Sequence, residues 1–116
     1  MKPEKQRIAI AEACGRVFRD GGNFAGVAQK LVEPPHGRLT HIMTHKAAIR
    51  STPDYLNDLN AMAEAETCEA IQRVGYAKYI ECLAIACGTE RLGALVFATS
   101  AQRAEAFLRT IGEWEE

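Results

Sequence analysis

Residues 98–112 read ATSAQRAEAFLRTIG, and this stretch decides more of the fold than any other. Thr99 and Gln102 have the spacing of a Thr-x-x-Gln capping box, which predicts that a helix begins here. Gly112 is placed to end that helix, and Trp114 can fold back onto its last turn. Between these limits, apolar residues recur at the spacing of a helix core face, namely Ala104, Phe107, Leu108 and Ile111.

The segments on the N-terminal side of this helix carry further patterns. The continuous apolar run at 93–98 is typical of a buried strand. Helical spacing of apolar residues predicts a helix over 76–87 and a longer one over 54–73, with Asp54 as its N-cap. A first helix is predicted over 3–14, because a proline in the first turn has no amide hydrogen to leave unpaired.

The region between the first and second helices has the character of strands. Residues 16–32 predict a hairpin around the turn sequence Asp-Gly-Gly-Asn at 20–23, and Pro34-Pro35 should end it. Residues 38–49 are ambiguous, since their first part favours a strand and their last part a helix. Helices before, between and after short strands predict a single α+β domain over 1–116, with three to four α-helices covering a small β-sheet.

Composition excludes several classes of protein. The chain has 116 residues, 47% hydrophobic and 25% charged, which is typical of one soluble globular domain. A formal net charge of −1 lacks the bulk basicity of many nucleic-acid binders. No apolar run approaches the ~20 residues of a membrane helix. No apolar signal core follows the charged start, so we expect a cytoplasmic protein without a membrane partner.

Charge is divided unevenly along the chain. Residues 1–50 hold nine basic and four acidic side chains, whereas residues 51–116 hold five and eleven. Three interpretations stay open: the two halves pack together and offset each other, the first half forms an anion-binding surface, or opposite faces of two copies meet in a homo-oligomer.

The four cysteines, Cys14, Cys68, Cys82 and Cys87, form no Cys-x-x-Cys pair. In a reducing cytoplasm we expect buried thiols that act as small hydrophobic side chains. A zinc site and a catalytic thiol are the alternatives. His41 and His45 have a spacing that can chelate a metal, but the sequence shows no further ligand set. We therefore predict no metal, no cofactor and no catalytic residue.

The basic, histidine-bearing segment 36–50 is the best candidate for ligand binding. Its donors suit a phosphate or a nucleotide, and a nearby tyrosine could stack on a base. If 38–50 were a strand, Arg38, Lys46 and Arg50 would share one face and the histidines the other. The alternative is a solvated connector between helices. The predicted ligand-binding residues are Arg38, His41, His45, Lys46, Arg50 and Tyr55.

Three helical blocks carry a resemblance to a known family. PDYLNDLNAMAEAE at 53–66, ATSAQRAEAFLRTIGEW at 98–114 and RIAIAEACG at 7–15 resemble the phage ABA-sandwich domain proteins, small proteins of tailed phages and prophages. This chain departs from the family pattern at Arg16 and Ala63. The resemblance implies a helix–sheet–helix sandwich and a phage accessory role, with no established catalytic residues.

The sequence leads to two main function hypotheses and one further alternative. The first is a non-enzymatic phage protein that antagonises host antiviral defence in the bacterial cytoplasm by sequestering a small anionic signal, such as a cyclic or ADP-ribose-type nucleotide. The second is a protein that docks on a host defence protein through the acidic helix face of 57–69. The third is a small metal-assisted hydrolase. A homo-oligomer is compatible with the first.

Overall fold

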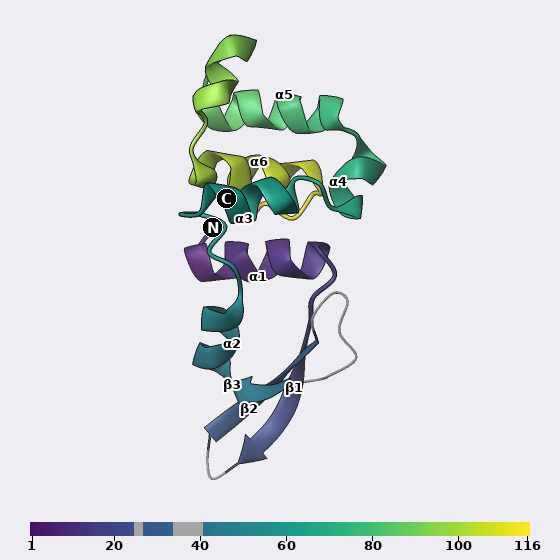
Figure 1. Cartoon of the computed structure of the whole chain (residues 1–116), viewed down its shortest axis with the longest axis vertical. Helices are drawn as coiled ribbons and strands as arrows, with labels where there is room; N and C mark the ends of the chain where they lie inside the picture. Colours follow the sequence, from purple (N-terminus) through teal and green to yellow (C-terminus); the bar gives the residue numbers. More distant parts are fainter. Residues whose placement is uncertain (25–26, 34–40) are drawn as a thin grey trace.

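The computed structural model describes the backbone of residues 1–24, 27–33 and 41–116, and the side chains of residues 1–18 and 46–116. The molecule is elongated, with extents of 54 × 25 × 23 Å, and its helices stack above a small sheet (Figure 1). The elements in chain order are α1 (Pro3–Ala13), β1 (Val17–Phe24), β2 (Val27–Glu33), β3 (His41–Thr44), α2 (His45–Ser51), α3 (Leu59–Ala65), α4 (Glu69–Val74), α5 (Tyr76–Cys87), the 3-10 helix η1 (Leu92–Phe97) and α6 (Ser100–Thr110).

The predicted helix–sheet–helix sandwich is wrong. Over the residues whose side chains are described, 66% are helical and 2% lie in a strand, and this part of the chain contains no sheet. Helices α1, α3, α4 and α5 pack around α6, so helices form the layers on both sides of the core. We call α1, α3–α6 and η1 the helical body.

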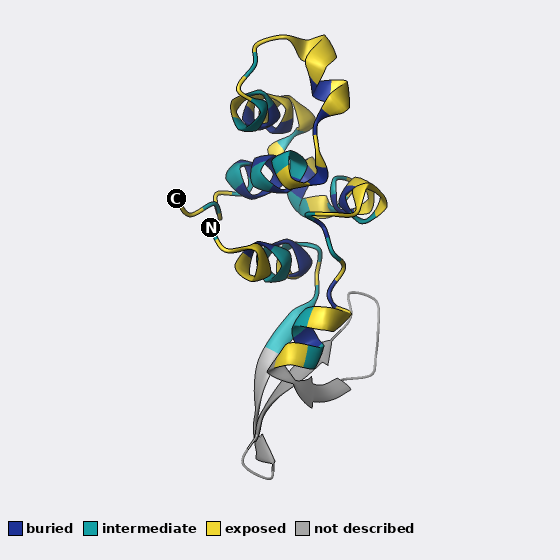
Figure 2. Cartoon of the chain, turned by 90° about the vertical axis from the view of Figure 1, so that its left-hand side faces the viewer, coloured by how far each residue is buried: buried dark blue, intermediate teal, exposed yellow. Residues whose placement is uncertain are grey.

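Helix α6 forms as the sequence predicts. The Thr99 hydroxyl accepts a hydrogen bond from the Gln102 amide at 3.1 Å, and the Gln102 side chain accepts one from the Thr99 amide at 2.9 Å. These two bonds pair amides that the first turn would otherwise leave free. Ala104, Phe107 and Leu108 are completely buried, and the dark-blue faces of the helices in Figure 2 turn toward one another.

The apolar run at 93–98 is η1 rather than the predicted buried strand. Leu95 is buried, but Leu92, Val96 and Phe97 are 68%, 73% and 85% exposed. A short apolar run cannot by itself distinguish a strand from a helical turn. Here the run spans the short connection between α5 and α6 and forms 3-10 turns there.

The predicted helix over 54–73 is two shorter helices, α3 and α4. Asp58, not Asp54, is the N-cap, since its carboxylate accepts from the amides of Asn60 at 2.9 Å and Ala61 at 3.3 Å. The break after α3 is stabilised by the Thr67 hydroxyl, which donates to the Glu64 carbonyl at 2.7 Å. Polar side chains that compete for backbone groups therefore divide this segment.

The three strands lie at the opposite end of the molecule from η1, in the order β1-β2-β3 with antiparallel pairing. Asp20 to Asn23, predicted as a turn, lie within β1 at a register irregularity. The pair Pro34-Pro35 lies outside the described residues. Helix α2 follows β3 directly and leads into the helical body through residues 52–58.

Candidate functional site

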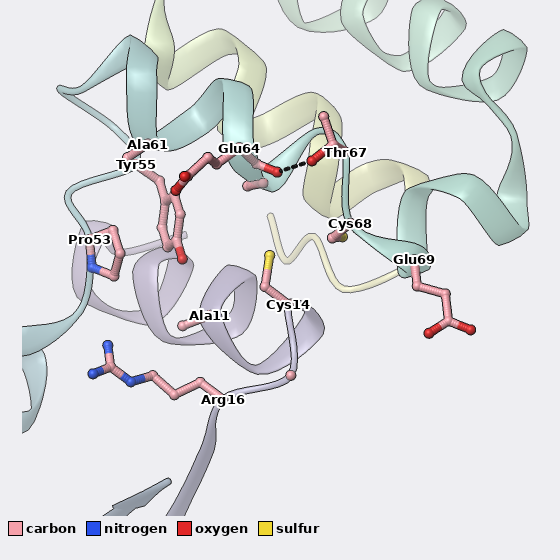
Figure 3. Close-up of a pocket in the computed structure, with 12 residues that line it drawn as sticks. Ala11, Cys14, Arg16, Pro53, Tyr55, Ala61, Glu64, Thr67, Cys68 and Glu69 are labelled. Atoms are coloured by element: carbon pink, nitrogen blue, oxygen red, sulfur yellow. Dashed lines mark hydrogen bonds between the residues drawn. The ribbon is translucent and has the colours of Figure 1, made fainter. Parts of the chain in front are cut away.

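A pocket of about 700 Å³ lies where the end of α1 faces α3 and the start of α4 (Figure 3). Pockets of this size hold small organic ligands. Its wall combines small apolar residues with a few groups that can donate, accept or carry charge. These polar and sulfur-bearing groups are Cys14, Arg16, Tyr55, Glu64, Cys68 and Glu69.

Tyr55 is 6% exposed and, among the residues that the structure describes, is the only aromatic one in the pocket wall. Burial, followed by the neighbouring Cys14 thiol, raises the pKa of Tyr55 to about 12, while the charge of Arg16 acts in the opposite direction. At neutral pH the phenol therefore keeps its proton. It can act as a hydrogen-bond donor, not as a phenolate base.

Arg16 supplies the positive charge of the pocket wall. One of its terminal nitrogens donates to the Ser51 carbonyl at 2.9 Å, and its guanidinium lies 5.9 Å from the Phe18 ring centre. Its Nε atom is buried and has no hydrogen-bond partner among the described residues. The side chain thus connects the end of α2 with the segment between α1 and β1.

Arg7, which lies within α1, also donates to backbone carbonyls near the end of α2. Its guanidinium donates to the Thr52 carbonyl and, at 3.3 Å, to the Pro53 carbonyl. Two arginines therefore bind the carbonyls at and just beyond the C-terminal end of α2, where the helix dipole is negative. We call Arg7, Arg16 and residues 51–53 the junction.

Two thiols, Cys14 and Cys68, lie in the pocket wall (Figure 3). Burial, then the charge and hydrogen bond of Cys68, raise the pKa of Cys14 to about 12. A thiol with that pKa is protonated at neutral pH, so Cys14 is a poor nucleophile in this state. Both thiols are free, as are Cys82 and Cys87.

The predicted ligand-binding residues do not converge on this pocket. Tyr55 lines it, but Lys46 and Arg50 do not. Both are exposed on α2, four positions apart. Because α2 begins at His45, the strand face that Arg38, Lys46 and Arg50 were expected to share does not exist.

The remaining predictions in this segment fall on residues with little description. His41 begins β3, opposite Val32 of β2, and His45 begins α2, but their side chains lie outside the described residues. Arg38 lies outside them entirely. Their proposed contacts with a ligand stay predictions.

Sequence reasoning overlooked most of the pocket. Cys14 and Cys68 were expected as small hydrophobic side chains, and Arg16 and Glu64 belong to no functional motif. They meet only because α1 packs close to the α3–α4 break, which the sequence pattern predicted as continuous helix. A tertiary contact brought them together, so no local signal could have identified them.

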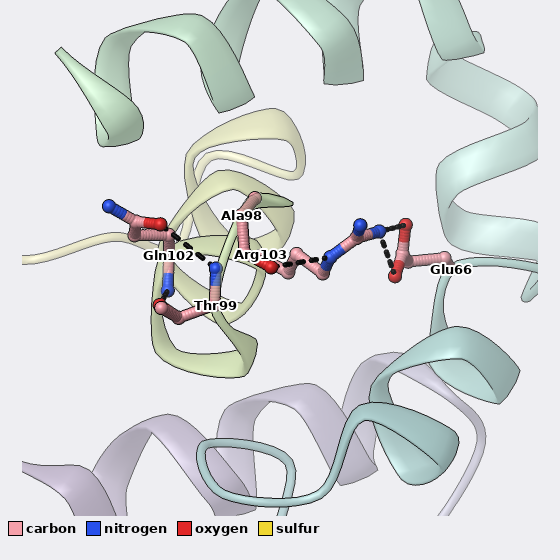
Figure 4. Close-up of polar contacts among 5 residues, drawn as sticks. All are labelled: Glu66, Ala98, Thr99, Gln102 and Arg103. Atoms are coloured by element: carbon pink, nitrogen blue, oxygen red, sulfur yellow. Dashed lines mark hydrogen bonds and ion pairs between the residues drawn. The ribbon is translucent and has the colours of Figure 1, made fainter. Parts of the chain in front are cut away.

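Of the four acidic residues in the face predicted over 57–69, Glu66 is half-buried, and Asp58, Glu64 and Glu69 are exposed. Asp58 caps α3, and Glu69 pairs with Arg73 at 2.7 Å. The Glu66 carboxylate binds Arg103 at 3.3 Å, and Arg103 also donates to the Ala98 carbonyl at 3.3 Å (Figure 4). Three carboxylates of this face therefore remain at the surface, and docking on a host protein through it stays a prediction.

The candidate metal ligands His41 and His45 have side chains outside the described residues. Within the described ranges, no three His, Cys, Asp or Glu side chains are close enough to hold a metal ion. No helix in the described part of the chain could cross a membrane.

No family model, curated protein or solved structure matches the chain.

Proposed function

We propose that this chain is a non-enzymatic binding protein that sequesters a small anionic ligand of the nucleotide type in the Tyr55 pocket. The observation that supports it best is the pocket's combination of groups. A guanidinium, an aromatic ring and a carboxylate surround a space of about 700 Å³. A nucleotide presents a phosphate, a flat ring and an amine donor, which are the matching partners.

Each group has a role in this proposal. Arg16 pairs with a phosphate oxygen through a charge-assisted hydrogen bond. Tyr55 contacts the base through the small exposed part of its side chain and donates from its hydroxyl. Glu64 accepts from an exocyclic amine, while the negative charges of Glu64 and Glu69 keep the phosphate on the Arg16 side.

The role in a cell is also a proposal. A phage accessory protein that removes a nucleotide signal from the host cytoplasm, as a homo-oligomer, would antagonise host defence without catalysis. The raised pKa values of Cys14 and Tyr55 support the non-enzymatic part, because both groups are protonated and therefore poor nucleophiles at neutral pH.

Titration calorimetry with a panel of cyclic dinucleotides, ADP-ribose and AMP tests the proposal. We expect one of them to bind, and Arg16→Gln to weaken it by about tenfold or more, since a charged hydrogen bond is lost. Arg50→Gln is the matched control, because Arg50 is exposed and outside the pocket.

Two outcomes would count against the proposal. No binding heat from any member of the panel would remove the nucleotide class. A larger loss in Arg50→Gln than in Arg16→Gln would move the site to α2. Circular dichroism melting of both variants must accompany the titration, because Arg16 also belongs to the junction.

A further inference from the structure

Two of the four cysteines come together although they are distant in the sequence. Cys14 is the C-cap of α1, and Cys68 is the N-cap of α4. Both are half-buried, both line the same pocket, and Figure 3 shows their side chains at one end of it. The two side chains are close enough for Cys68 to contribute to the raised pKa of Cys14. Cys82 and Cys87 lie on α5, away from this pocket.

The position of Cys68 leaves its sulfur available. An N-cap residue usually accepts a hydrogen bond from the first turn of its helix, but Cys68 makes no side-chain cap bond. Its backbone amide is already paired with the Ala65 carbonyl at 3.0 Å. Its sulfur therefore lies in the pocket wall with Cys14 and is not engaged in a cap bond.

We propose that Cys14 and Cys68 are an oxidation site, at which a low-molecular-weight disulfide such as glutathione disulfide converts the two thiols into an intramolecular disulfide. The inference stands apart from the proposed ligand, because it rests on the two sulfurs alone. It also departs from the sequence expectation that all four thiols serve as small hydrophobic side chains.

The exchange proceeds in two balanced steps. The Cys68 thiolate attacks one sulfur of glutathione disulfide, which breaks that S–S bond, forms a mixed disulfide and releases one glutathione thiolate. The Cys14 thiolate then attacks the Cys68 sulfur, forms the Cys14–Cys68 bond and releases the second glutathione thiolate. Both thiol protons are taken up by the departing thiolates.

The order of the steps follows from the state of Cys14. While Cys68 is free, burial together with the Cys68 thiol raises the pKa of Cys14 to about 12, so Cys14 attacks poorly. The mixed disulfide removes the contribution of Cys68 to this rise, while burial, the largest cause, remains. Cys14 therefore reacts second, and its position beside the Cys68 sulfur favours that step.

The product would join the two helix ends that border the pocket. Gly15, with a φ of 102°, follows Cys14 and starts the connection into β1. A covalent link at Cys14 would fix the point where the chain leaves the helical body. It would also close a long loop of chain, which restricts the unfolded state.

The test uses the full-length protein, fully reduced and then incubated with glutathione disulfide. We expect the four free thiols to fall to two, with Cys14 and Cys68 in one cross-linked peptide by mass spectrometry. The melting temperature should rise by roughly 10 °C, and a reducing agent should reverse the rise. Cys87→Ser is the matched control and should oxidise as the parent does.

Cys14→Ser and Cys68→Ser should each prevent the cross-link and leave three thiols or a mixed disulfide. If either variant folds poorly, the thiol count and peptide map of the parent protein still decide. Four thiols that stay alkylatable after oxidation, a cross-link between any other pair, or covalent dimers would each overturn the proposal.

Discussion

The helical body and the junction are held together by different kinds of interaction. In the helical body, apolar side chains from α1 and α3–α6 form one buried cluster around Phe107. At the junction, Arg7 and Arg16 bind backbone carbonyls of residues 51–53. Apolar burial is insensitive to direction, whereas charged hydrogen bonds fix an orientation. The body therefore supplies stability, and the junction positions α2 and the strands.

The largest expected effect comes from the centre of the body. Phe107→Ala should lower the free energy of unfolding by about 3–5 kcal/mol, because Phe107 is completely buried and its removal leaves a cavity. Phe97→Ala is the matched control, since Phe97 is 85% exposed. Urea unfolding measures both. Similar losses in the two variants would contradict the placement of the core in the helices.

The junction should respond more weakly and more locally. Arg7→Gln removes two hydrogen bonds from a charged group and should cost about 2 kcal/mol. Hydrogen exchange should accelerate at the amide of Tyr55, which donates to the Pro53 carbonyl at 3.0 Å, and not within α6. Arg7→Lys keeps the charge but loses the forked guanidinium that donates to two carbonyls. Its free energy of unfolding should therefore lie between those of the parent and Arg7→Gln.

An exchange pattern that spreads equally over α6 would show that the junction and the body unfold as one unit. The difference between them would then be one of contact chemistry only. Unchanged exchange in Arg7→Gln, with unchanged stability, would mean that Arg16 alone holds the end of α2.

Alkaline pH should destabilise the folded chain. The pKa of Cys14 rises from 9.0 to about 12 and that of Tyr55 from 10.0 to about 12. Burial also raises the pKa of Tyr79. The unfolded chain loses these protons first, so the stability present below about pH 9 declines as pH rises further. We expect the melting temperature to fall by several degrees between pH 9 and pH 11.

Cys14→Ala and Tyr55→Phe should each reduce this pH slope, because each removes one of the groups that titrates differently in the two states. The parent protein at pH 7 and pH 8 gives the baseline, over which the melting temperature should stay level. A slope that neither substitution changes would contradict the pocket environment described for these two groups.

Elements with local signals could be predicted from the sequence. The first helix, the helix over 76–87 and α6 were all expected, since a proline, a glycine or a capping box marks an end of each. The local sequence pattern could not show that the predicted sandwich was wrong. An apolar run such as 93–98 fits a strand or a 3-10 turn equally well. The pocket was unpredictable for another reason: Arg16 and Cys68 meet only through the packing of α1 near α4.

The smallest expected effect tests the best-predicted element. Thr99→Ala should cost about 1 kcal/mol, because it removes the hydroxyl that accepts from the Gln102 amide in the capping box. Thr99→Ser keeps that acceptor and should unfold like the parent in urea. Exchange should accelerate at the first turn of α6 and stay unchanged at the Tyr55 amide, because both hydrogen bonds of the box lie within that first turn. A loss of exchange protection at both places would show that the junction and the start of α6 open together. That result would contradict the distinction between the helical body and the junction.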